Sequence, residues 1–165
     1  MTDAITVRDA GERDLAAMSE LAGRLVRFHH DIDPRRYLLV PEVERGYERW
    51  FRTELANADA LLLVAVAGDG SVAGYLYGRI EARDWNVLLD AHAVLHDILV
   101  RDEATGLGAG RALIDAFVAR VRARGTPRVV LHTAVSNERA QRLFRALGFR
   151  PTMLEMMLDL EAPQG

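Results

Sequence analysis

A glycine-rich loop between an apolar strand and an amphipathic helix constrains this chain more than any other feature. Residues 93–100 are the candidate strand, and residues 105–110 read Thr-Gly-Leu-Gly-Ala-Gly before a helix that ends at Gly125. Glycines at alternate positions let backbone N–H groups converge without Cβ atoms in the way. The positive end of the helix adds about 0.3–1 kcal/mol per bound charge. The unit therefore predicts an anion site, although a simple tight turn would use the same residues.

Two other phosphate-binding loops fit this sequence poorly. A P-loop requires lysine after its last glycine, and all 21 basic residues of this chain are arginine. The dinucleotide pattern G-x-G-x-x-G requires glycine or alanine where this chain has Arg111. It also expects an acidic residue downstream, where Val135 and Ser136 stand. A different kind of anion-binding unit is therefore indicated.

Two motifs in the second half of the chain resemble a known family. Residues 98–113, Ile-Leu-Val-Arg-Asp-Glu-Ala-Thr-Gly-Leu-Gly-Ala-Gly-Arg-Ala-Leu, are similar to motif A of the GNAT superfamily of acetyl-CoA-dependent N-acetyltransferases. Motif B of that family resembles a second set of residues at the expected spacing: Asn137, Ala140, Leu143, Phe144, Gly148 and Phe149. The two motifs occur in the family's order and at the family's separation, which makes the pair far more specific than either alone.

The resemblance implies that acetyl-CoA binds along this unit. The backbone of the strand would pair with the pantetheine arm, the loop would hold the pyrophosphate, and Asn137 would contact the cofactor near the thioester. The cofactor-binding residues implied by the resemblance are Ile98, Leu99, Val100, Gly106, Leu107, Gly108, Ala109, Gly110, Arg111, Asn137 and Phe144.

Two residues depart from the family pattern. Thr105 stands where the family usually has Arg or Gln, which removes a side-chain contact to the cofactor. Phe144 replaces the tyrosine that often protonates the leaving CoA thiolate, although a thiol pKa near ~8.5 makes a dedicated acid helpful rather than compulsory. These departures motivate an alternative, a noncatalytic acyl-CoA-binding or regulatory module. A nucleotide-binding protein with the same loop is a further alternative.

Two histidines are candidates for the catalytic base. An alkylamine with a pKa near ~10.4 is almost fully protonated at neutral pH, and an imidazole with a pKa near ~6.5 is suited to remove the proton. His96 lies two residues before Ile98, on the same predicted strand face, and resembles the histidine of arylalkylamine-type members. His132 lies on the neighbouring strand, where ribosomal-alanine-type members carry a glutamate. Asp97 is expected on the opposite face, in a structural role, and each histidine could instead be packed in the sheet.

The region between residues 31 and 47 corresponds to the variable acceptor-binding part of the family. Candidates to receive a cationic amine are Asp31, Asp33, Tyr37 and Tyr47, although a solvated helix end would use the same residues. A metal site is not expected at His29 and His30, because adjacent histidines on a helix diverge by about 100° and no third ligand is suitably spaced.

The apolar patterning predicts an α/β (α+β) fold within a single domain, residues 1–165. Strands are expected at residues 5–8, 60–67, 72–80, 93–100, 128–133 and 149–160, with helices at 14–30, after Pro41, after the glycine loop, and from a cap at Ser136. Hairpins precede one βαβ unit, so the sheet should be mixed and mostly antiparallel. The resemblance implies six to seven strands, splayed between the fourth and fifth, and about four flanking helices.

The net charge, the cysteine content and the lengths of the apolar runs limit which partners and which compartment are expected. A net charge of −3 gives no attraction to nucleic acid or anionic lipid, and the absence of cysteine excludes a disulfide or a thiol nucleophile. No apolar run approaches the ~18 residues of a membrane span and the N-terminus lacks a signal peptide, so a cytoplasmic protein is expected. A homodimer is common in the family, and an exposed C-terminal strand could mediate it.

These features predict an N-acetyltransferase that needs no metal. The amine of a small molecule or peptide would attack the thioester of acetyl-CoA directly, in a ternary complex. His96 or His132 would act as base, and a strand N–H, from Leu99 or Val100, would polarise the carbonyl. No covalent enzyme intermediate is required.

Overall fold

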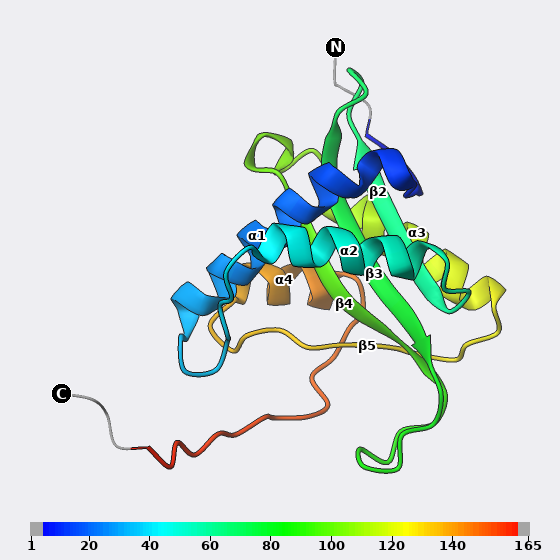
Figure 1. The fold of residues 1–165 in the computed structure, drawn as a ribbon. Coiled ribbons are helices and arrows are strands. Elements are labelled where there is room, and N and C mark those ends of the chain that lie inside the picture. The colour runs from blue at the N-terminus through cyan, green and yellow to red at the C-terminus, as the bar shows by residue number, and fades with distance from the viewer. Residues whose placement is uncertain (1–4, 162–165) are drawn as a thin grey trace.

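The computed structural model describes residues 5–161, which form a five-stranded sheet between two pairs of helices (Figure 1). The strands are β1 (Thr6–Asp9), β2 (Ala60–Val66), β3 (Val72–Glu81), β4 (His92–Val100) and β5 (Val129–Leu131), in that order across the sheet. The helices are α1 (Leu15–Ile32), α2 (Val43–Leu55), α3 (Ala109–Ala123) and α4 (Glu138–Ala146). Strands β1 to β4 are antiparallel and β5 is parallel to β4. The predicted mixed sheet and four helices are confirmed.

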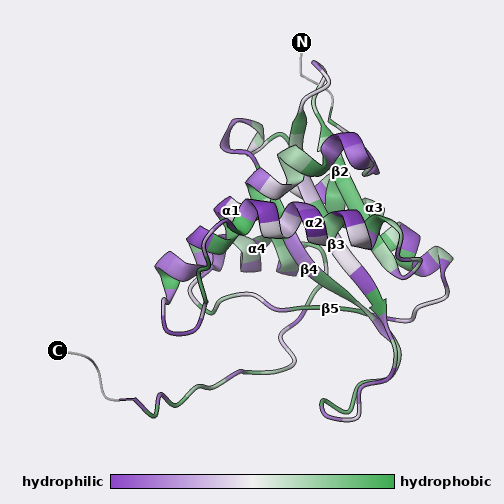
Figure 2. Ribbon diagram, viewed as in Figure 1, coloured by the Kyte–Doolittle hydropathy of each residue, from purple (hydrophilic) through white to green (hydrophobic). Residues whose placement is uncertain are grey.

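Each face of the sheet has its own hydrophobic core. Helices α1 and α2 cover one face, where Leu62 and Val64 of β2 pack with Phe51 and Met18. Helices α3 and α4 cover the other, where the intervening β2 residues pack with Phe117 of α3. Because both faces are covered, β2 is apolar at every position, and Figure 2 shows this hydrophobic stripe through the middle of the molecule.

A β-bulge in β4 decides which of its residues share a face. The register pairs Tyr77 of β3 with Asp97 and Gly78 with Leu95, so His96 is the extra residue. Leu95 packs in the α3 core, and the next β4 residue that packs there is Ile98. The two are three residues apart, whereas a regular strand returns to the same face every two residues. The bulge therefore turns Asp97 toward the α1–α2 face, and the sequence-based assignment of His96 and Ile98 to one face is wrong.

The parallel pairing of β4 with β5 ends early. The last paired residues are Leu95 and Leu131, whereas β4 continues to Val100. Residues 96–100 therefore have a strand partner only on the β3 side. This unpaired edge lies where the family resemblance implied that the fourth and fifth strands splay apart.

The predicted strand over residues 149–160 does not form, so six or seven strands is an overestimate. Phe149 packs against the α3 core, but residues 150–161 follow as an exposed segment without regular structure. The alternating apolar pattern is real, yet the adjacent edge strand β5 is only three residues long and does not pair with it. Within the described part of the chain, no helix combines the length and apolar character that a bilayer crossing requires.

Helix α4 also begins differently from the expectation. Its N-cap is Asn137, whose side-chain oxygen accepts the N–H of Ala140 at 3.2 Å, rather than Ser136. Asparagine and serine cap almost equally well, so the sequence alone did not separate the two.

Gly78 at the bulge should be intolerant of a side chain. A Cβ there would lie 2.7 Å from the carbonyl oxygen of Val94 and would clash with the ring of Phe117. We expect Gly78→Ala to lower the free energy of unfolding by about 1–3 kcal/mol, as overpacked cores do. Urea denaturation followed by circular dichroism measures this.

The matched control is Gly46→Ala in α2, where a Cβ would meet nothing within 4 Å. That change should be neutral or stabilising by up to about 1 kcal/mol, because alanine is the better helix former. Equal destabilisation by both substitutions would contradict the close packing of α3 on the bulge.

Candidate active site

The glycine loop has an open face. Gly106 and Gly108 have φ values of 84° and 82°, the left-handed region that favours glycine. A Cβ built on either residue would meet no atom within 4 Å. The loop is therefore not filled by the chain's own side chains, and its backbone is accessible on that side.

Five backbone N–H groups in and just after this loop have no hydrogen-bond acceptor among the described residues. Leu107 donates to the carbonyl of Ala104 at 3.3 Å, and Ala112 donates to Gly108 at 2.9 Å. Among the described residues no acceptor is present for the N–H groups of Gly106, Gly108, Ala109, Gly110 and Arg111. Unpaired donors at the start of a helix, at the positive end of its dipole, form a ready site for phosphate oxygens.

The end of the loop lies close to α4 and to β4. At Gly110 a Cβ would lie 3.4 Å from the Leu143 side chain of α4 and 3.7 Å from Val100 of β4. The turn that precedes the loop is held by Arg101, which donates to the carbonyl of Val72 at 2.9 Å and forms an ion pair with Glu20 of α1 at 2.8 Å. The unpaired edge of β4 thus leads directly to the free N–H groups.

His96 lies on the bulge at the point where β4 and β5 separate. Its ring stacks on Tyr77 with centroids 5.2 Å apart, and Nε2 lies 4.0 Å from Glu81. Partial burial lowers the pKa of His96 below 6.5, against the opposing effect of Glu81. His132 also lowers that pKa, and it is exposed just after β5. The structure therefore brings the two predicted base candidates near each other, and burial favours the neutral form of His96 by lowering its pKa.

Asp97, which the sequence analysis expected in a structural role, follows His96 on the bulge. It sits beside two tyrosine hydroxyls, and the Tyr75 hydroxyl donates to it at 3.3 Å. Burial raises the pKa of Asp97 to about 6, although hydrogen bonds from Tyr75 and Tyr47 act in the opposite direction. Burial and the nearby Asp97 likewise raise the pKa of Tyr47. The bulge places this carboxyl on the same side of the sheet as His96.

The four acceptor candidates have different surroundings. Asp33 accepts the backbone N–H groups of Arg35 and Arg36 at 3.0 and 3.2 Å, so it stabilises the turn after α1. The Tyr37 ring lies 4.9 Å from that of His29. Asp31 is exposed on the last turn of α1. Tyr47, by contrast, lies within the aromatic cluster of α2, next to Asp97.

Three predicted cofactor residues have structural contacts of their own. Asn137 uses its side-chain oxygen to cap α4. Phe144 is buried in the α3 core, edge-on to Phe149 at 5.8 Å, where it offers no proton. Arg111 is exposed and forms an ion pair with Asp115 at 3.5 Å.

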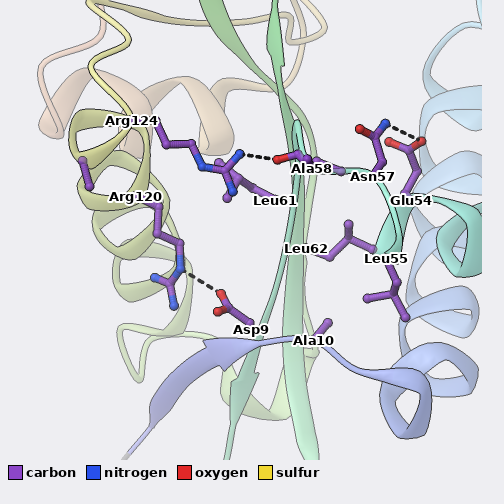
Figure 3. A pocket seen from close by; sticks show the side chains of 12 residues that line it. Asp9, Ala10, Glu54, Leu55, Asn57, Ala58, Leu61, Leu62, Arg120 and Arg124 are labelled. Atoms are coloured by element: carbon purple, nitrogen blue, oxygen red, sulfur yellow. Dashed lines mark hydrogen bonds and ion pairs between the residues drawn. The ribbon is translucent and has the colours of Figure 1, made fainter.

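A hollow of the surface lies elsewhere. A cavity of about 430 Å³ opens between the C-terminal end of α3, the end of α2 and the start of β2 (Figure 3). Arg120 pairs with Asp9 at 2.8 Å across it, and Arg124 donates to the carbonyl of Ala58 at 2.7 Å. Arg120 is twelve residues, or roughly 18 Å, along α3 from Gly108. None of the predicted site residues lines this cavity, and its own side chains already satisfy one another. No cluster of potential metal ligands is found in residues 5–161.

Comparison with known proteins identifies the family. The model of the acetyltransferase (GNAT) family matches residues 25–149. The chain belongs to this family. Similarity to proteins that are named acetyltransferases agrees with this assignment.

Curated relatives have two different acceptors in their names. The chain is 29% identical, over 87% of its length and 79% of the relative's, to L-methionine sulfoximine/L-methionine sulfone acetyltransferase from Pseudomonas aeruginosa. It is 36% identical, over 65% of its length, to mycothiol acetyltransferase from Nocardiopsis dassonvillei. The chain spans only about a third of that longer relative, 31% of its length.

Solved structures share the fold at low identity. A tetramutant of the BH1408 protein from Bacillus halodurans superposes with a TM-score of 0.80 at 19% identity, covering 94% of this chain and 99% of that one. AAC(6')-Iy, solved with the bisubstrate analogue CoA-S-monomethyl-acetylneamine, gives 0.77 at 18% identity, covering 96% and 99%. These similarities establish the GNAT fold for this chain.

Asp97 should make folding stability depend on pH. Its pKa is about 6 in the folded protein and 3.8 ordinarily, so the unfolded chain releases this proton first as pH rises. Stability should therefore fall between about pH 4 and pH 6 and then level off. We expect Asp97→Asn to remove this loss and to raise the free energy of unfolding at pH 8 by roughly 1–3 kcal/mol relative to the wild type.

Urea unfolding at pH 4, 6 and 8 measures the effect. Asp31→Asn, which removes an exposed carboxylate, is the control and should leave the pH dependence of stability as it is in the wild type. An Asp97→Asn variant with the wild-type pH dependence would show that this carboxyl is not held in an unfavourable environment.

Proposed function

We propose that this chain is an acetyl-CoA-dependent N-acetyltransferase, acting on a primary amine of a small molecule or peptide as a single domain, residues 1–165. The observation that carries the proposal is the row of free N–H groups at the glycine loop, next to the unpaired edge of β4. A diphosphate followed by an extended amide-containing chain is complementary to that arrangement. Coenzyme A has both parts.

Acetyl-CoA, the acyl donor, would lie along the free edge of β4, with its pyrophosphate at the start of α3. The N–H groups of residues 106–111 would donate to the pyrophosphate, since charge-assisted hydrogen bonds are roughly twice as strong as neutral ones. The backbone of Ile98 to Val100 would pair with the pantetheine amides, because no strand occupies that edge. Acetyl-CoA supplies an activated thioester, which an amine can attack without prior activation by the enzyme.

The transfer proceeds by direct attack. His96 accepts a proton from the acceptor ammonium, and the neutral amine forms a C–N bond to the acetyl carbon. The N–H of Leu99 or Val100 donates to the developing oxyanion. The attached nitrogen releases its second proton to water as the C–S bond breaks, which leaves the neutral amide, and CoA departs as a thiolate. Phe144 has no proton to give, so the thiolate is protonated by the imidazolium of His96 or by water. His132 is the second candidate for the base.

Asp97 would hold the acceptor as a cation before the proton is removed. The carboxyl lies on the same face as His96, beside Tyr47, which links it to the predicted acceptor region. Ammonium binding there would compensate for the burial of the carboxylate, because a buried charge is stabilised by an opposite one. On this assignment Asp97→Asn should bind a cationic acceptor more weakly and acetyl-CoA normally. An unchanged KM for the amine would exclude the role.

A noncatalytic acyl-CoA-binding module is the alternative that Phe144 and Thr105 favour. The Thr105 hydroxyl donates to the carbonyl of Arg101 at 3.4 Å, a local contact, and Phe144 is buried. Binding of acetyl-CoA without turnover on any amine would support the module. Methionine sulfoximine and aminoglycosides are the first acceptors to assay, because named relatives and fold neighbours act on them.

Closing the open face of the loop should weaken donor binding. We expect Gly106→Val, which adds a branched side chain at φ 84°, to reduce the affinity for acetyl-CoA at least tenfold by covering the free N–H groups. Gly70→Val is a matched control, because Gly70 has φ 87° and equally open surroundings but lies in the β2–β3 turn. Isothermal titration calorimetry measures both. Wild-type affinity in Gly106→Val, or an equal loss in Gly70→Val, would contradict the proposed phosphate site.

Removing the base should change the pH profile of turnover. Because burial lowers the pKa of His96 below 6.5, wild-type kcat should fall only as pH drops through that lowered value. His96→Ala should lose about 10²–10⁴ of kcat at neutral pH and recover as pH approaches the amine pKa. Released CoA can be followed with a thiol reagent, because the protein has no cysteine. If His96→Ala and His132→Ala both keep the wild-type profile, neither is the base.

A further inference from the structure

His96 differs from three other histidines of the chain in what its ring nitrogens contact. In those three, Nδ1 lies within hydrogen-bonding distance of a backbone carbonyl oxygen. They are His29, His30 and His92, at 2.9, 2.8 and 2.9 Å. A carbonyl oxygen only accepts, so Nδ1 carries the proton in each of these rings. Within residues 5–161 no backbone carbonyl holds a nitrogen of His96 in this way, and both of its nitrogens are available for other work.

The orientation of the His96 ring is set by stacking. The ring lies nearly parallel to that of Tyr77, with centroids 5.2 Å apart and an angle of 19° between the planes. Tyr77 is itself held on both sides, because its hydroxyl donates to the buried carboxyl of Glu54 at 2.7 Å and Trp50 packs edge-on against its ring at 4.7 Å. The stack therefore determines in which direction the two nitrogens of His96 point.

The edge of the ring that carries Nε2 faces a carboxylate. Oε1 of Glu81 lies 4.0 Å from Nε2, and both side chains are 39% exposed. This distance is longer than a direct hydrogen bond, and the attraction is electrostatic, stronger near a protein surface than in bulk water. The contacts of a catalytic base are often long without substrate and shorten in the complex. Because a carboxylate only accepts, it favours a proton on Nε2 of His96.

Charged and titratable groups face His96 from several elements of the fold. Glu81 and Arg79 belong to β3, Glu54 belongs to α2, and His132 follows β5. Against the effect of burial, Glu81 raises the pKa of His96 by more than either His132 or Arg79 lowers it. Arg79 also lies 3.6 Å from Glu81, but Glu54 raises the pKa of Arg79 more than Glu81 does. Glu81 is therefore the group that most favours a positive charge on His96.

We propose that Glu81 is a positioning residue, which keeps a proton on Nε2 of His96 so that Nδ1 offers the lone pair that takes the proton of the acceptor. The role rests on the proposed function, in which His96 is the base. The acceptor ammonium gives one proton to Nδ1 and keeps the electron pair of that N–H bond, so the amine becomes neutral and the ring becomes an imidazolium. Glu81 then faces the new positive charge and stabilises it. The carboxylate acts on the histidine and does not touch the substrate.

Nuclear magnetic resonance of the ligand-free protein tests which nitrogen carries the proton. With nitrogen-15-labelled histidine, long-range proton–nitrogen correlations distinguish a protonated Nδ1 from a protonated Nε2. At about pH 8, where an imidazole is neutral, we expect the proton of His96 on Nε2. The histidines that contact a carbonyl through Nδ1 should give the opposite pattern, and the spectrum of His96→Ala identifies the signal of His96. A neutral His96 with its proton on Nδ1 would overturn the proposal.

Removing the charge of Glu81 should weaken the base and leave donor binding as it is. In Glu81→Gln the pKa of His96, followed by the same correlations, should fall below its wild-type value because the carboxylate that favours the imidazolium is gone. At neutral pH kcat should drop about three- to tenfold, with an unchanged KM for acetyl-CoA. Glu48→Gln is the matched control, because Glu48 is 43% exposed and pairs with Arg52 within α2, and it should keep the wild-type pKa and kcat. A wild-type pKa of His96 in Glu81→Gln would contradict the positioning role.

These readouts separate the role of Glu81 from the proposed function as a whole. The position of the proton and the pKa of His96 are measured without acetyl-CoA or an acceptor, so they test Glu81 even when the chosen amine is not turned over. A lowered pKa of His96 in Glu81→Gln together with an unchanged kcat would mean that Glu81 acts on a histidine that is not the base. That result would overturn both the positioning role and the choice of His96, while leaving the proposed site for acetyl-CoA unaffected.

Discussion

The end of the parallel pairing between β4 and β5 is the constraint on which the site depends. Pairing stops at Leu95 and Leu131. The bulge at His96 then shifts the register of β4 against β3 by one residue, so the alternation of faces changes for residues 97–100. An interior strand normally has both edges paired, because unpaired backbone groups are costly when buried. Here one edge of β4 is left free over residues 96–100, beside the free donors of the glycine loop. The two sets of unpaired groups form one continuous surface.

The sequence specified the parts of this arrangement that depend on local pattern. The glycine loop was predicted because Gly106 and Gly108 lie between an apolar strand and a helix with one apolar face, and the β2–β3 hairpin because turn residues separate two apolar runs. The prediction that side chains of β4 alternate strictly between the two faces failed at Asp97. One inserted residue, His96, moves every later side chain to the opposite face, and the sequence carries no signal of such an insertion. The prediction of a sixth strand failed for another reason: the apolar pattern of residues 149–160 is genuine, but these residues pair with no strand in the described part of the chain.

The candidate site also carries a cost that a purely structural arrangement would avoid. Asp97 is a carboxyl among tyrosines, and its raised pKa means that the folded protein disfavours the charged form. An apolar residue of similar size would pack there without that penalty, since a buried polar group is stabilising only when it is fully compensated. Residues that oppose stability in this way are concentrated at functional sites. Neither Phe144 nor Asn137 shows such a cost, in agreement with their packing and capping contacts.

In the proposed reaction, the two faces of the sheet have different roles. Ile98 and Val100 belong to the face of α3 and α4, where the free N–H groups await a diphosphate. Asp97 and Leu99 belong to the face of α1 and α2, where the acceptor is proposed to bind. A donor approaching on one face and an amine approaching on the other can meet only where the sheet is open, at the free edge of β4. His96, the inserted residue at the start of that opening, therefore lies where the proposed reaction requires a base.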